Sequence, residues 1–355
     1  MVELPRRLRL AVLALALGVV PALAFDAFAW PAAARAETAI HFILDRKVDG
    51  PTAPILLAID RGFFKLEGLG VTLDTAPGGP SDAINKITAG NDDMGVSDLN
   101  LLIKLRDQGV TPIKAVFAVF DKPAYAIIAR KNRGIVAPRD LVGKTLAAPV
   151  GDPTAAVWPV FAKVNGVDAA KVILEPVSLP VREPMLAAGE VDAITGYSFM
   201  SYVDLEARGV PPDDLAVLLM ADHGLALYGE TIVVAPSFAQ AHPDAVRGFL
   251  HGYVRGLKDA LRDPLRAVTA VLRRNDAASK DVELERLRMA FRDNIVTPAV
   301  KANGVGAVDP ARFATAIDQM ALAYAFRAKD KAAEVFDPSL LPPPAERSLI
   351  GLALR

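Results

Sequence analysis

The chain has no cysteine among its 355 residues. This absence excludes disulfide bonds, thiolate metal sites, iron–sulfur clusters and a catalytic cysteine. It also excludes the lipid-modified cysteine that would tether an exported bacterial protein to a membrane. Histidine is scarce as well, and the four residues His41, His223, His242 and His251 have no spacing typical of a metal-binding pair. The sequence therefore predicts neither a metal site nor a cofactor.

A surplus of positive charge is also missing. The chain has 40 Lys and Arg against 41 Asp and Glu, which gives a formal net charge of −1. Proteins that bind nucleic acid neutralise backbone phosphates with Lys and Arg. Nucleic acid is therefore not expected as a partner.

The first 36 residues have the three parts of a secretory signal peptide. Three arginines before residue 10 precede an apolar run over Leu10–Ala24, and Ala34-Arg35-Ala36 supplies a cleavage site with small residues. A membrane anchor is the alternative, but the run is short and contains Pro21. We predict cleavage after Ala36 and a periplasmic mature protein without a lipid anchor. Sec and twin-arginine export both remain open.

Short β-rich apolar runs alternate with helical patterns through most of the mature chain. Strands are predicted at 39–44, 71–75, 94–97, 113–120, 125–129, 145–148, 172–175, 193–195, 216–220 and 231–234. From Pro236 onward the pattern is helical almost to the end. Alternation of this kind predicts an α/β fold with mostly parallel sheets covered by helices.

A weak internal repeat accompanies this alternation. Residues 89–97 (AGNDDMGVS) are similar to residues 188–196 (AGEVDAITG): each has a helix end, a Gly stop, an Asp and a buried strand. This repeat indicates two related lobes, although helix–Gly–strand punctuation is common in α/β proteins.

Motifs of several enzyme classes are incomplete. Gly143-Lys144-Thr145 resembles the end of a phosphate-binding P-loop, but Pro138 stands where the first glycine is needed. The sequence contains no G-x-G-x-x-G, G-x-S-x-G or H-E-x-x-H motif. We therefore expect a protein that performs no chemistry.

The most specific stretch is residues 58–73 (AIDRGFFKLEGLGVTL). It resembles the signature of the NMT1/THI5-like and SsuA-like (sulfonate, nitrate and taurine) families of ABC-transporter solute-binding proteins. The resemblance continues in order through residues 78–82, 89–97, 140–145, 185–193 and 243–250. The signature itself is explained by a helix stop at Gly62 and two core phenylalanines, so it identifies the family without marking a ligand site.

The resemblance implies the type II periplasmic binding-protein fold, in which two α/β lobes enclose a ligand cleft and two crossover segments join them. We place the crossovers near 123–126 and 229–231. Lobe 1 is then 37–123 plus 229–355, and lobe 2 is 124–228. The expected partners are a small organic ligand and an ABC permease in the inner membrane, and the protein is expected to be a monomer.

Ligands in such folds lie beyond the carboxyl ends of strands, near helix N-termini. In lobe 1 these positions are held by Asp45, Gly79, Ser81, Ser97 and Asp98. Ser81 and Asp98 are equally explained as N-caps, with Ser81 opening a helix over 82–89. In lobe 2 the candidates are Gly151, Asp152, Thr154 and Tyr197, the last aligned with Asp98 in the repeat.

Acidic residues dominate these candidates. Asp45, Asp98 and Asp152 together would repel a simple anion, so a neutral, zwitterionic or amine-bearing organic molecule fits better. The pyrimidine-binding members of the family carry an aromatic residue and an Asn after the first strand, whereas this chain has Asp45-Arg46-Lys47. Two alternatives to solute import stay open: a thiamine-pyrimidine synthase of the same fold, and a ligand-sensing module for a membrane receptor.

Overall fold

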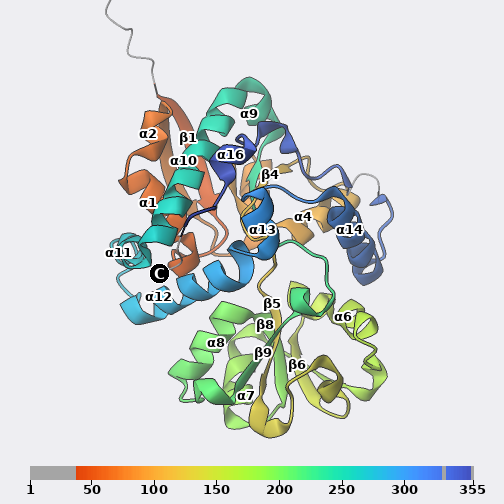
Figure 1. The fold of residues 1–355 in the computed structure, drawn as a ribbon. Coiled ribbons are helices and arrows are strands. Elements are labelled where there is room, and N and C mark those ends of the chain that lie inside the picture. Colours follow the sequence, from red (N-terminus) through yellow and green to blue (C-terminus); the bar gives the residue numbers. More distant parts are fainter. Residues whose placement is uncertain (1–36, 330–332, 353–355) are drawn as a thin grey trace, which may run out of the picture. The chain divides into compact units, whose positions relative to one another are not determined.

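The computed structural model describes residues 37–329 and 333–352, which contain two five-stranded sheets (Figure 1). The predicted signal peptide at 1–36 lies outside the described residues. Contacts group both sheets into one compact unit of the chain. The predicted lobe boundaries therefore remain a prediction.

Sheet A has the strand order β2-β1-β3-β10-β4. Its strands are β1 (Thr38–Leu44), β2 (Leu69–Thr75), β3 (Met94–Asp98), β4 (Lys114–Ala118) and β10 (Glu230–Val234). The helices between them are α1 (Ala53–Asp60), α2 (Phe63–Leu66), α3 (Pro80–Thr88) and α4 (Leu99–Asp107).

Sheet B has the strand order β7-β6-β8-β5-β9. Its strands are β5 (Tyr125–Arg130), β6 (Thr145–Pro149), β7 (Ile173–Val177), β8 (Ala193–Tyr197) and β9 (Leu215–Leu219). Its helices are α5 (Pro153–Ala156), α6 (Trp158–Val164), α7 (Arg182–Ala188) and α8 (Ser198–Ala207).

Helices follow the last strand, as the sequence predicts. They are α9 (Pro236–Ala241), α10 (Pro243–Arg262), α11 (Pro264–Leu272), α12 (Lys280–Met289), α13 (Pro298–Asn303), α14 (Pro310–Tyr324) and α16 (Pro344–Arg347). Within residues 37–329 and 333–352, no helix is long and apolar enough to cross a membrane.

The two sheets have equivalent topologies, since β2, β1, β3, β10 and β4 of sheet A take the same positions as β7, β6, β8, β5 and β9 of sheet B. This equivalence agrees with the internal repeat. The repeat also preserves one set of hydrogen bonds. The Asp93 carboxylate accepts from the His41 amide at 2.8 Å, and the Asp192 carboxylate accepts from the Thr145 amide at 2.9 Å. Each aspartate thus holds the backbone of a neighbouring parallel strand, within β1 at His41 and at the start of β6 at Thr145, and β3 and β8 occupy equivalent central positions.

The expectation of mostly parallel sheets is confirmed in strand direction, because in each sheet four strands run the same way and one runs opposite, which makes both sheets mixed. In sheet A, β1 pairs in parallel with β2 and β3, but β10 pairs antiparallel with β3 and β4. In sheet B, β5 is the equivalent of β10, since it pairs antiparallel with β8 and β9. Both β5 and β10 follow a segment that passes from the other sheet, so they run opposite to the strands built by local β–α–β units.

The signature stretch forms a packing core for the long helix α10. Gly62 adopts φ 70° between α1 and α2, as expected of a helix stop. Phe64 is buried and stacks on Phe249 of α10, with ring centroids 4.7 Å apart. Figure 1 shows α10 beside α1, and Gly256 permits this approach because a Cβ there would lie 2.4 Å from the Pro54 carbonyl oxygen. The signature is therefore structural.

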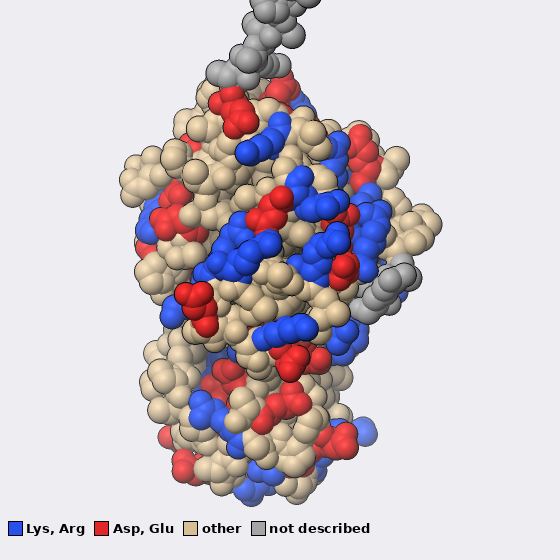
Figure 2. Space-filling model, turned by 90° about the vertical axis from the view of Figure 1, so that its left-hand side faces the viewer, with Lys and Arg blue, Asp and Glu red and all other residues tan. Residues whose placement is uncertain are grey.

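The surface of the protein carries charges of both signs. Figure 2 shows Lys and Arg interspersed with Asp and Glu over one face, without a large region of one sign. This pattern fits the near-zero net charge of the sequence.

Candidate functional site

The carboxyl end of β3 and the start of β10 bring two acids together. Asp98 is the last residue of β3 and Glu230 the first of β10, and the antiparallel register places them opposite each other. The equivalent pair in sheet B is aromatic, because Tyr125 starts β5 opposite Tyr197 at the end of β8. Each sheet therefore contributes one cross-strand pair at matching positions of the repeat.

These two pairs line one small cavity. Asp45, Asp98, Tyr125, Tyr197, Gly229 and Glu230 surround it, together with Phe120, Ala124 and Phe199. Its volume is ≈ 20 Å³. A space of that size holds about one water molecule. A larger ligand needs the lining side chains, or the strand ends that carry them, to move apart.

Asp98 joins the acidic pair to the aromatic pair. Its Oδ1 accepts a hydrogen bond from the Leu101 amide at 2.9 Å, which caps α4. Its Oδ2 accepts from the Tyr125 hydroxyl at 2.8 Å. Burial raises the pKa of Asp98 to about 6, although both hydrogen bonds act in the opposite direction. The side chain thus caps a helix and also forms a wall of the cavity.

Arg46 holds the remaining acids in place. Its guanidinium donates to Asp45 Oδ1 at 2.8 Å, to Asp49 Oδ2 at 2.7 Å and to Glu230 Oε1. Burial raises the pKa of Asp45 and of Glu230, and the Arg46 charge opposes this effect in both. One guanidinium therefore faces three carboxyl groups, and its Nη2 is buried without a hydrogen-bond partner among the described residues.

The two tyrosine rings are stacked, with centroids 5.7 Å apart and an angle of 1° between their planes. The Tyr125 ring is fixed, because its hydroxyl donates to Asp98 and lies 3.4 Å from Asn100 Nδ2. No hydrogen bond in the described part of the chain uses the Tyr197 hydroxyl. Burial, followed by the charge of Asp98, raises the pKa of both tyrosines. Both phenols therefore stay neutral and present flat apolar faces.

Asp45, Asp98 and Tyr197 are the predicted site residues that the structure brings to the cavity. Ser97 is buried in β3, and its hydroxyl donates to the Pro80 carbonyl at 3.3 Å, so it holds the start of α3. Gly79, at φ 79°, is the N-cap residue of α3. The prediction that Ser81 caps this helix is wrong, because the helix begins at Pro80, two residues before the predicted start, and Ser81 is an exposed residue within it.

Gly151, Asp152 and Thr154 lie at the start of α5 and are not among the residues that line the cavity, although the charge of Asp152 acts on the lining residue Tyr197 and raises its pKa, after burial and the charge of Asp98. Asp152 Oδ1 accepts from the Thr154 amide at 2.7 Å, and its Oδ2 accepts from Arg182 at 3.1 Å. Arg182 is buried and also donates to Glu183 at 2.7 Å. These groups satisfy one another, and Trp158 of α6 is buried in the core.

Sequence reasoning missed Glu230, Tyr125 and Arg46. Glu230 and Tyr125 lie inside the predicted crossovers, and a crossover next to a cleft was a usable signal. Arg46 follows Asp45 directly, and its role depends on Glu230, 184 residues away.

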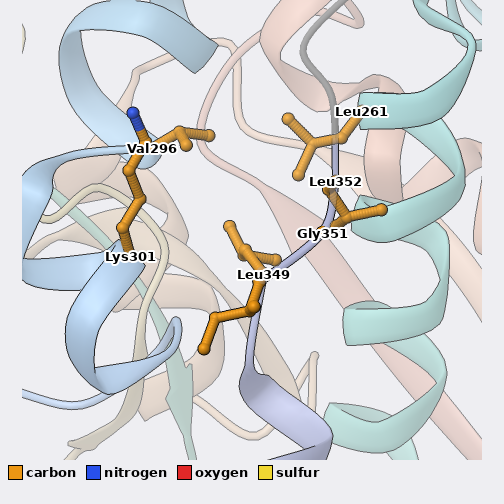
Figure 3. A pocket seen from close by; sticks show the side chains of 7 residues that line it. Leu261, Val296, Lys301, Leu349, Gly351 and Leu352 are labelled. Carbon is orange, nitrogen blue, oxygen red and sulfur yellow. The ribbon is translucent and has the colours of Figure 1, made fainter.

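A larger pocket of ≈ 350 Å³ lies at the C-terminal segment (Figure 3). Leu261 of α10, Val296, Lys301 of α13, Leu349 and Leu352 line it. It has one charged side chain and no converging strand ends. The cavity between the acidic and aromatic pairs is therefore the candidate site.

The two mixed sheets and the site at their strand ends define a periplasmic binding-protein fold. The structure is similar to the periplasmic aliphatic sulphonate binding protein SsuA from Escherichia coli, with a TM-score of 0.65 at 16% identity over 89% of this chain and 95% of that chain. The chain belongs to the NMT1/THI5-like family, whose model matches residues 51–267.

Two curated relatives have different functions in their names. A 4-amino-5-hydroxymethyl-2-methylpyrimidine phosphate synthase from Schizosaccharomyces pombe is 25% identical over 253 residues, covering 67% of this chain and 70% of the relative. Riboflavin-binding protein RibY from Chloroflexus aurantiacus is 27% identical over 219 residues, covering 60% of this chain and 59% of RibY. The family therefore includes both enzymes and solute-binding proteins.

Proposed function

We propose that the protein is a periplasmic solute-binding protein that delivers a small organic solute to an ABC importer. The observation that carries this proposal is the cavity to which each sheet contributes one cross-strand pair at its strand ends. A ligand there would touch both sheets at once. Binding could then be coupled to closure of one sheet region onto the other.

The lobe boundaries form part of this proposal. Lobe 1 (37–123 plus 229–355) would contain sheet A, and lobe 2 (124–228) would contain sheet B. The two connecting segments lie side by side, since the Gly229 amide donates to the Phe120 carbonyl at 3.0 Å and the Phe120 amide to the Glu230 carbonyl at 3.0 Å. Such a pair of segments suits a hinge.

The export predicted from the sequence agrees with the same role. The pattern at 1–36 is that of a signal peptide, and the likeness to periplasmic SsuA and to RibY agrees with a binding function. The permease is the partner that this role requires.

An enzyme remains the second candidate, because several curated relatives are named pyrimidine phosphate synthases. The specific observation in its favour is the buried Asp98, whose pKa of about 6 would suit proton transfer near neutral pH.

One experiment separates the two. The protein is purified from the periplasm of its source cells, denatured, and its small molecules are identified by mass spectrometry. A single compound, released in near-stoichiometric amount and rebinding unchanged, supports the binding function. If the purified protein instead forms a pyrimidine phosphate on incubation, and releases no compound that rebinds unchanged, the binding function is contradicted and the synthase is favoured.

A further inference from the structure

The cavity is acidic on one side and aromatic on the other. Asp45, Asp98 and Glu230 contribute carboxyl groups to its lining, and no Lys or Arg is among the described residues that line it. Arg46 lies behind these acids and compensates them only in part, because it also pairs with Asp49. Burial raises the pKa of all three carboxyl groups, that of Glu230 to about 8, so a cation beside them would stabilise their ionised forms.

Two carboxyl oxygens at the cavity have no partner. Arg46 uses Asp45 Oδ1 and Glu230 Oε1, and no hydrogen bond in the described part of the chain reaches Asp45 Oδ2 or Glu230 Oε2. The Asp45 side chain is only 5% exposed. Neither oxygen is among the fully buried side-chain atoms without a partner, so both remain reachable from the cavity or from solvent. Each is therefore a free acceptor for a ligand N–H.

The tyrosine pair supplies the opposite wall. Tyr125 is fixed by Asp98, whereas the Tyr197 hydroxyl is held by no hydrogen bond among the described residues. Tyr197 is therefore the side chain that can give way. A flat group in its place would lie against the Tyr125 ring, and a positive charge near that ring gains from its π face.

We propose that the ligand of this site is an organic cation, a protonated amine or amidine on a flat or apolar body, held by Asp45 and Glu230 and stacked on the tyrosine wall. This inference rests on the proposed function. Its charge preference is opposite to that of a sulfonate site, since an anion would meet three carboxyl groups and no lining base. The fold is similar to that of SsuA, and the charge preference is argued from the lining residues of this chain.

Three probes of the same shape test the charge preference. Benzamidinium, benzamide and benzoate are flat, nearly isosteric, and cationic, neutral and anionic respectively. We expect calorimetry at pH 7.5 to show that benzamidinium binds at least 10-fold more tightly than benzamide, and that benzoate does not bind. Failure of benzamidinium to bind at millimolar concentration overturns the proposal, as does equal or tighter binding of benzamide or benzoate.

Variants assign the preference to the cavity. Asp45→Asn and Glu230→Gln keep the shape of each side chain and should each weaken benzamidinium binding by about 10- to 100-fold while leaving benzamide binding little changed. Asp244→Asn, at an 88% exposed carboxylate on α10, is the matched control and should bind benzamidinium like the parent. If Asp45 serves only to pair with Arg46, Asp45→Asn will lower the melting temperature but leave the benzamidinium-to-benzamide ratio unchanged. That result, with the same ratio in Glu230→Gln, overturns the assignment.

This test is distinguishable from that of the proposed function. An anionic compound released from the purified protein would preserve the binding function and overturn the cation preference. Selective binding of benzamidinium together with pyrimidine phosphate synthesis would preserve the cation preference and overturn the binding function.

Discussion

Asp98 combines a structural and a binding position in one side chain. It caps α4 through the Leu101 amide and accepts the Tyr125 hydroxyl, yet it also lines the cavity. Its pKa is raised by burial to about 6 from an ordinary 3.8. Between those values the folded protein holds a proton that the unfolded chain has released. The free energy of unfolding therefore falls as pH rises from about 4 to 6, by at most about 1.4 kcal/mol per pH unit from this group.

The variant Asp98→Asn should remove this contribution. Asn still caps a helix N-terminus well, so the fold should persist. We expect chemical denaturation at pH 4, 5, 6 and 7 to show a flatter profile in Asp98→Asn than in the parent. The charged and titratable groups around the site are Asp45, Arg46, Asp49, Tyr125, Tyr197, Glu230, Tyr253 and Tyr324. Asp244→Asn should keep the parent profile, and an unchanged slope in Asp98→Asn would contradict the assignment.

The structure brings three of the predicted site residues to one cavity, where the sequence signal is local, and their binding roles stay predictions. Asp45, Asp98 and Tyr197 each follow a predicted strand, and the repeat aligned the last two. Glu230 and Tyr125 were missed because their importance depends on antiparallel register with strands far away in the sequence. Ser97 also lies at the carboxyl end of β3. Side chains alternate along a strand, however, so the Ser97 hydroxyl donates to the Pro80 carbonyl and does not line the cavity.

At the scale of elements, most helices and strands were predictable because Gly, Pro and apolar periodicity mark their ends. The direction of β5 and β10 was not predictable, since the residue pattern of a strand is the same whether it pairs parallel or antiparallel. The close packing of α10 on α1 was also hidden, because a helical glycine carries no periodic signal. In the structure, a Cβ at Gly256 would lie 2.4 Å from the Pro54 carbonyl oxygen and 2.7 Å from the Ala58 Cβ.

Gly256→Ala should therefore destabilise the protein despite the better helix propensity of alanine. Its Cβ meets backbone, which cannot rotate away, so we expect a loss of about 1–3 kcal/mol in the free energy of unfolding. Gly248→Ala on the same helix is the control. Its Cβ would lie 3.0 Å from the Glu67 Cβ, a milder overlap that a shift of a few tenths of an ångström relieves, so its loss should be smaller. Urea denaturation measures both, and equal or reversed effects would refute the packing argument.

At the scale of the whole molecule, Arg312 of α14 ties the two connecting segments together. Its guanidinium donates to Asp121 Oδ1 at 2.8 Å in the segment before β5. It also donates to the Leu227 carbonyl at 2.7 Å and the Ala226 carbonyl at 3.1 Å in the segment before β10. The same group lies over the Tyr228 ring, 4.0 Å from its centroid. One side chain thus restrains both segments about which a hinge would turn.

Arg312→Ala should loosen that hinge and not only the fold. Losing charge-assisted hydrogen bonds worth about 1.5–3 kcal/mol should shift local opening by about 10- to 100-fold. Hydrogen exchange is therefore expected to accelerate at residues 119–124 and 224–229 while the strands of both sheets keep their protection. Arg312→Lys should behave similarly, because an ammonium cannot reproduce the fork of donors. Arg292→Ala, at a side chain that is 63% exposed, is the control and should leave both segments unchanged. Uniform acceleration across all strands would mean that Arg312 supports global stability alone. Selective acceleration, together with a larger radius of gyration, would mean that this contact sets how readily the cavity opens to admit its ligand.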